Sequence, residues 1–82
     1  MLLYFEFEGR RHKAQVQWPK NDDSVAVHLL DEALINEFPA DLIFTIEDNR
    51  KVNYIVEDPA NRRLTDLQDI IKRRLQEFTN KM

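Results

Sequence analysis

Few side chains in this sequence are of the types that perform metal or nucleophilic chemistry. Cysteine is absent, which excludes disulfides, thiolate zinc sites, iron–sulfur clusters and cysteine nucleophiles. His12 and His28 are the only histidines, and their separation matches no metal-ligand spacing. On a helix, His28 and Glu32 would stand one turn apart, but two ligands are too few for a structural zinc site. We expect neither a metal nor another cofactor.

Catalytic groups are also poorly placed. The single serine, Ser24, has no flanking glycine to build a nucleophile elbow, so we expect a cap or turn residue there. The paired carboxylates fall in polar stretches, whereas acid–base catalysis needs a carboxyl group in an apolar cleft. One glycine, Gly9, is too few for a phosphate-binding loop. The sequence therefore predicts a non-enzymatic protein with no small-molecule ligand.

Two basic loops could bind nucleic acid. Their residues are Arg10, Arg11 and Lys13 in loop 10–13, and Arg62 and Arg63 in loop 62–63. Both loops could share one edge of a sheet, near Tyr4 or Trp18, and cations beside an aromatic ring are typical of single-stranded nucleic-acid binding. The net charge of −3 and interspersed acidic pairs weaken this hypothesis. Nucleic-acid binding is therefore the alternative function. Because the protein is acidic overall, nucleic acid is an unlikely partner.

A C-terminal helix is the clearest element among those that must position these residues. Apolar residues recur at three- and four-residue steps, namely Leu64, Leu67, Ile70 or Ile71, Leu75 and Phe78. Thr65 lies at the expected N-cap of a helix running to Asn80, and Gln68 completes a capping box. A lone amphipathic helix of this length is marginal in water, so its apolar side needs a partner surface.

Two alternating segments predict antiparallel hairpins that could supply that surface. The first has strands at 2–8 and 12–18 around the only glycine, and the second has strands at 42–47 and 52–57 around a polar turn. The segment 25–38 fits either a third strand followed by a short helical turn near 31–38, or one helix. We favour the strand and turn.

The predicted fold is α+β, a single antiparallel sheet of four to five strands with the C-terminal helix packed on one face. No repeat or linker divides the chain, so residues 1–82 form one expected domain. The expected helix-facing residues are Leu3, Phe5, Phe7, Val16, Trp18, Leu42, Phe44, Ile46, Val52, Tyr54 and Val56.

Apolar residues are also expected on the opposite face of the sheet. They are Leu2, Tyr4, Ile43 and Ile55. A short chain has a modest core, so docking of these side chains on a second copy or another protein would add useful burial. The leading hypothesis is a protein-interaction or homo-oligomeric accessory domain, with a homodimer or an unidentified protein as its partner.

The composition, with 43% hydrophobic and 33% charged residues, predicts a soluble globular protein. No stretch approaches the ~20 apolar residues of a membrane span. The apolar start is interrupted by Glu6 and Glu8 and lacks preceding basic residues, unlike a signal peptide. We expect a cytoplasmic location and no membrane partner.

Overall fold

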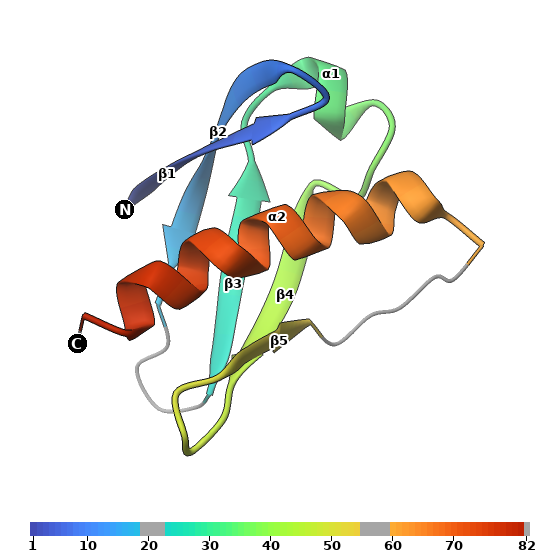
Figure 1. Cartoon of the computed structure of the whole chain (residues 1–82). Coiled ribbons are helices and arrows are strands. Elements are labelled where there is room, and N and C mark those ends of the chain that lie inside the picture. The colour runs from blue at the N-terminus through green and yellow to red at the C-terminus, as the bar shows by residue number, and fades with distance from the viewer. Residues whose placement is uncertain (19–22, 55–59, 82) are drawn as a thin grey trace.

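The computed structural model describes residues 1–18, 23–54 and 60–81, and shows a curled five-stranded antiparallel sheet with a C-terminal helix packed on it (Figure 1). The strand order is β1-β2-β3-β4-β5. The strands are β1 (Leu2–Phe7), β2 (Arg10–Gln17), β3 (Ser24–Leu29), β4 (Asp41–Ile46) and β5 (Val52–Tyr54), and the helices are α1 (Glu32–Ile35) and α2 (Arg62–Thr79). The predicted α+β class is confirmed.

The first hairpin turns at Glu8 and Gly9, between the paired residues Phe7 and Arg10. Both turn residues have positive φ, 51° and 77° respectively. This is the backbone of a two-residue type I′ turn, whose twist matches that of the flanking strands. The turn is tighter than expected, because the two strands extend to within two residues of each other.

The middle segment forms β3 and then the single turn of α1, so the strand-and-turn interpretation is confirmed. Val27 of β3 pairs with Val16 of β2 on one side and with Leu42 of β4 on the other. A helix at this position would have left both neighbouring strands without their hydrogen-bonding partner. Phe38 closes α1 by donating its backbone N–H to the carbonyl of Leu34 at 2.8 Å.

The predicted start of the C-terminal helix was wrong. The helix begins at Arg62, and its N-cap is Asn61, whose side-chain oxygen accepts the backbone N–H of Leu64 at 3.1 Å. Thr65 lies within the first turn and donates its hydroxyl to the backbone carbonyl of Asn61 at 3.3 Å. Gln68 is buried on the sheet side of α2, and is not part of a capping box. Asparagine is a strong N-cap, so the helix gains three residues before Thr65.

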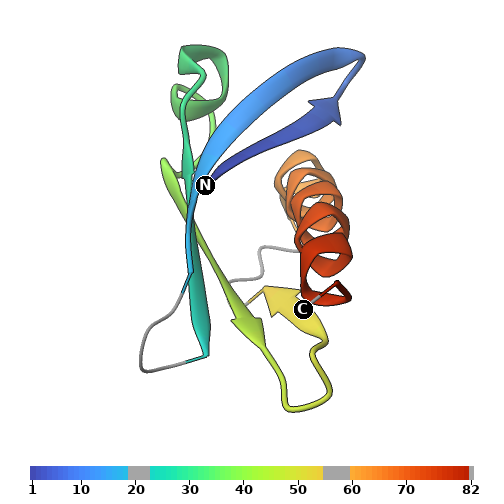
Figure 2. The same ribbon diagram turned by 90° about the vertical axis from the view of Figure 1, so that its left-hand side faces the viewer.

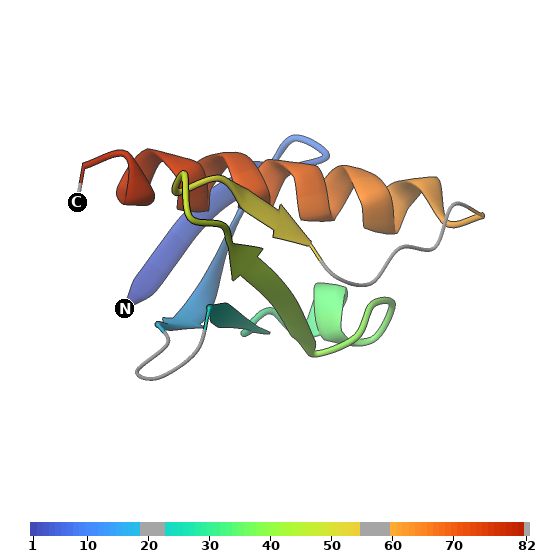
Figure 3. The same cartoon turned by 90° about the horizontal axis from the view of Figure 1, so that it is seen from below.

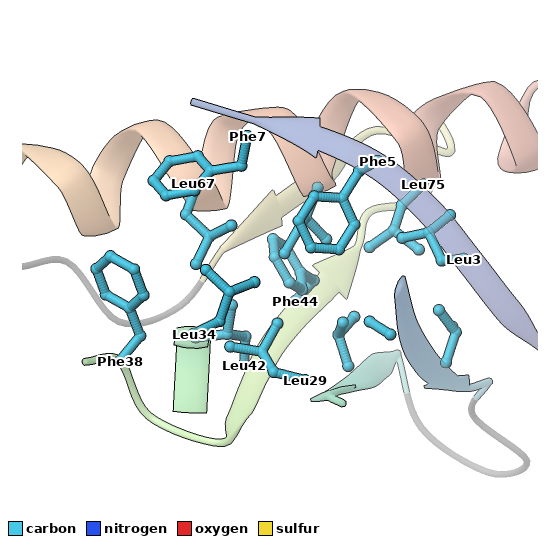
Figure 4. Close-up of a cluster of buried hydrophobic side chains, with 14 of the residues drawn as sticks. Leu3, Phe5, Phe7, Leu29, Leu34, Phe38, Leu42, Phe44, Leu67 and Leu75 are labelled. Atoms are coloured by element: carbon cyan, nitrogen blue, oxygen red, sulfur yellow. The ribbon is translucent and has the colours of Figure 1, made fainter. Parts of the chain in front are cut away.

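Helix α2 lies in the hollow of the sheet, with β1 and β5 on its two sides (Figures 2 and 3). Ile71 is fully buried, while Ile70 is only partly buried, which resolves the choice between them. Figure 4 shows aromatic and leucine side chains from strands and helices meeting in this core. Most of the expected inner-face residues are buried there, and Trp18, Ile46 and Tyr54 pack partly buried against it. Val56 lies outside the described residues.

Both edges of the sheet are bound by side chains of α2. Arg74 donates its Nε–H to the backbone carbonyl of Tyr4 on β1 at 2.9 Å. At the other edge, Gln76 accepts the backbone N–H of Val52 and donates to the carbonyl of Arg50, each at 2.8 Å. Open sheet edges invite pairing with other chains. The helix therefore closes off part of each edge as well as the inner face.

Candidate interaction surfaces

The outer face of the sheet carries three of the four predicted docking residues. Leu2 and Tyr4 are neighbours on β1 and are 46% and 45% exposed. Ile43 on β4 is 37% exposed, but β2 and β3 separate it from β1, and it pairs with Ala26 of β3. Ile55 lies outside the described residues. The structure thus brings Leu2 and Tyr4 together and places Ile43 apart from them.

An additional exposed apolar residue, Leu30, belongs to this face. It follows β3 and is 42% exposed. The contact between His12 and Asp31 continues the β2–β3 register beyond its last paired residues, which places Leu30 beside Lys13. Lys13 in turn pairs with Tyr4. Leu30 was not predicted to be a contact residue, because the sequence of residues 25–38 fitted either a strand or a helix.

One predicted cation, Arg63, is bound within the fold. It forms ion pairs with Glu8 of the first hairpin and with Glu37 after α1. Its guanidinium lies 5.9 Å from the ring centroid of Phe7 and 5.6 Å from that of Phe38. The hydrogen bond from Arg63 lowers the pKa of Glu8, and it raises the pKa of Arg63. This arginine links α2 to the hairpin and to α1.

The remaining basic residues are divided between two sides of the molecule. Arg11 and Lys13 lie on the outer face of β2, where Arg11 sits 5.5 Å from the ring centroid of Tyr4. Arg10 lines a pocket of about 210 Å³ together with Arg63. Arg62 is exposed at the start of α2. The predicted loops 10–13 and 62–63 are part of strand β2 and the first turn of α2, and successive residues of a strand point to opposite faces, so these cations do not form one continuous surface.

Both histidines contact an aspartate, and these are Asp31 at the N-cap of α1 for His12 and Asp41 of β4 for His28. His12 is buried and its Nδ1 lies 2.6 Å from Oδ2 of Asp31. His28 is exposed on the outer face, and its Nδ1 contacts the carboxylate of Asp41. Within residues 1–18, 23–54 and 60–81, no group of three or more metal-ligating side chains gathers around either pair.

Comparison of the chain with models of protein families, with curated proteins and with solved structures found no match. Neither helix in the described part of the chain is long and apolar enough to cross a membrane. Function has to be inferred from the surfaces of the molecule itself.

Proposed function

We propose that this protein is a small non-enzymatic module that binds another protein molecule through the outer face of its sheet. One observation carries the proposal. Helix α2 fills the inner face, whereas the outer face exposes nearly half of the side chains of Leu2 and Tyr4. Exposed aromatic residues are enriched in the energetic centres of protein interfaces.

The hydrogen bonds at the sheet edges support docking through side chains. Tyr4 on β1 and Val52 on β5 already use edge backbone groups to bind Arg74 and Gln76. A partner strand that joined either edge would have to displace these bonds. The outer face requires no such rearrangement.

The shape of this face sets the kind of partner. Because the sheet curls around α2, its outer face is convex (Figures 2 and 3). Stable interfaces bury about 800 Å² per partner, and two convex faces meet over a smaller area. A weak homodimer or a different protein with a concave surface therefore fits better than a tight homodimer.

The test is a double variant, Tyr4→Gln with Ile43→Gln, and its matched control is Gln17→Ser on the same face. Sedimentation velocity up to ~1 mM protein measures self-association, because a weak dimer dissociates near this range. Affinity purification with the same variants measures binding of another protein. We expect association to be lost in the double variant and kept in the control, with circular dichroism unchanged. A strict monomer whose co-purified proteins are the same for both variants contradicts the proposal.

The second candidate, nucleic-acid binding, is favoured by the contact of Arg11 with the exposed ring of Tyr4. The ion pairs of Arg63 with Glu8 and Glu37 weigh against it, because phosphate would have to compete with two carboxylates. Reversing the charges of Arg10 and Arg11 should abolish binding of a random oligonucleotide at low salt. Absence of binding by the unchanged protein rejects this candidate.

A further inference from the structure

A groove lies between β1 and α2 at the β1 edge of the sheet, and Tyr4 of the outer face lines its larger part. It has two adjoining parts, of about 290 Å³ and about 470 Å³. Ile70 and Arg73 of α2 line both parts. The smaller part continues to Asp66 and the larger to Glu77, so the groove follows the helix axis.

The two parts of this β1–α2 groove differ in charge. Asp66 and Asp69 line the smaller part, whereas Arg11 lines the larger and Arg73 lies where the two meet. None of these four side chains has an ion-pair partner among the residues that the structure describes.

The other charges along the groove are largely balanced. Glu8 is bound by Arg63, and Arg74 is bound by Glu77. Glu6 lies opposite Arg11 on the neighbouring strand, so its carboxylate offsets part of the positive charge of Arg11 but not that of Arg73. The uncompensated charge is therefore negative at Asp66 and Asp69 and positive at Arg73.

We propose that the β1–α2 groove binds an extended segment of a partner protein that has a basic residue at one end, an apolar centre and an acidic residue at the other end. The apolar centre would lie on Ile70, which is only partly buried. The helix rises by 1.5 Å per residue, so Asp66 and Arg73 are about 10.5 Å apart along its axis, and the whole groove to Glu77 is about 16 Å long. At roughly 3.3 Å per extended residue, the whole groove holds about five residues.

The mixed charge favours a protein segment over a polyanion. A nucleic-acid strand has the same charge along its length, so its phosphates would meet Asp66 and Asp69 at one end of the groove. A protein segment can place opposite charges at its two ends. Side chains carry the recognition, because the outward carbonyl of Tyr4 already accepts a hydrogen bond from Arg74.

The test is an NMR titration of the whole ¹⁵N-labelled chain with pools of capped five-residue peptides. Two pools carry lysine and glutamate at opposite ends, in either order, with mixed Val, Ile and Leu between them. A third pool has glutamate at both ends, and a fourth has lysine at both ends. We expect one mixed-charge pool to cause saturable shifts of the Ile70 and Arg73 amides, with a Kd of roughly 0.1–1 mM for so small a contact.

Arg73→Glu and Lys72→Glu form a matched pair, because they make the same charge change on adjacent residues. Lys72 lies on the β5 side, with its Nζ 5.9 Å from the ring centroid of Tyr54. Arg73→Glu should weaken binding of the mixed-charge peptides roughly tenfold, or ~1.4 kcal/mol, and should strengthen binding of the peptides with two lysines. Lys72→Glu should change neither by more than about twofold.

Three results overturn this inference. They are the absence of saturable shifts with any pool, equal losses for the two variants, and tightest binding by the pool with two glutamates. The outer-face proposal is tested separately with Ile43→Gln alone, because Tyr4 lines the larger part of the groove whereas Ile43 lines neither part. Association that depends on Ile43 while every peptide pool fails would reject the groove alone.

Discussion

The inner and outer faces of the sheet are built from the same strands, but only the inner face is covered. On β4, Phe44 is fully buried, while its neighbour Ile43 is 37% exposed. Successive side chains on a strand point to opposite faces, so adjacent residues differ in burial while sharing one backbone environment. The contribution of a strand residue to the stability of this protein therefore depends more on the face of the sheet that it occupies than on its residue type.

The two histidine–aspartate pairs give the same lesson for polar groups. His12 joins β2 to the N-cap of α1, and His28 joins β3 to β4, each through its Nδ1. His12 and Asp31 are 9% and 33% exposed, whereas His28 and Asp41 are 39% and 60% exposed. Water screens the outer pair and competes for its hydrogen bonds, so the inner pair should contribute more to stability.

The largest predicted effect compares Phe44 with Ile43. Phe44→Ala should destabilise the protein by about 3–5 kcal/mol, because it removes a large side chain and leaves a cavity in the core. Ile43→Ala should cost about 1 kcal/mol or less, because much of that side chain already contacts water. Urea unfolding at equilibrium measures both. Similar costs for the two variants would show that the outer face is covered as well.

The next effect compares the two aspartates. Asp31→Ala should cost about 1.5–3 kcal/mol, because it leaves the Nδ1 of buried His12 without its charged partner. Asp41→Ala should cost less than about 1 kcal/mol, as for other exposed pairs. The same unfolding measurement decides the order, and an equal or larger cost for Asp41→Ala would be inconsistent with the contrast between faces.

A smaller effect tests the sheet edges, where the two faces meet. Gln76→Ala should cost roughly 1–2 kcal/mol, because it leaves the N–H of the fully buried Val52 without its acceptor. Arg74→Ala should cost less, because its bond to Tyr4 is exposed. Hydrogen exchange should show faster exchange at the Val52 amide in the Gln76 variant only. Unchanged protection there would mean that α2 does not hold the β5 edge.

The smallest effect concerns the exposed ion pair of Glu8 with Arg63. Folding lowers the pKa of Glu8 below its usual 4.5, through the hydrogen bond from Arg63. Its contribution to stability is therefore present above pH 4.5 and is lost as the pH falls through the lowered pKa. Glu8→Gln should remove this pH dependence, whereas Glu6→Gln should keep it. Urea midpoints near pH 7 and near pH 3 measure the change.

Local patterns predicted most of the architecture. The alternation in both hairpins identified the strands and most residues of the inner face, because a side chain's face depends only on its position along the strand. The position of α2 as the cover of that face followed from its apolar stripe. The start of the helix was missed because Thr65 and Gln68 have the spacing of a capping box, although Asn61 is the stronger N-cap residue.

The candidate surfaces were harder to predict. The sequence identified Leu2 and Tyr4 as outward-facing, but did not reveal that Ile43 lies apart from them across two strands. It treated Arg63 as available for a ligand and did not single out Arg73. Their roles differ because Arg63 meets Glu8, 55 residues away in the chain, and such a contact depends on packing.

By itself, the sequence determined the class of elements and the two-sided character of each strand, because both follow from interactions between near neighbours. The tertiary structure decided which charges are paired, which sheet edges are bound by the helix, and where a groove separates opposite charges. These properties depend on how α2 lies against the sheet, which brings together residues that no local pattern connects.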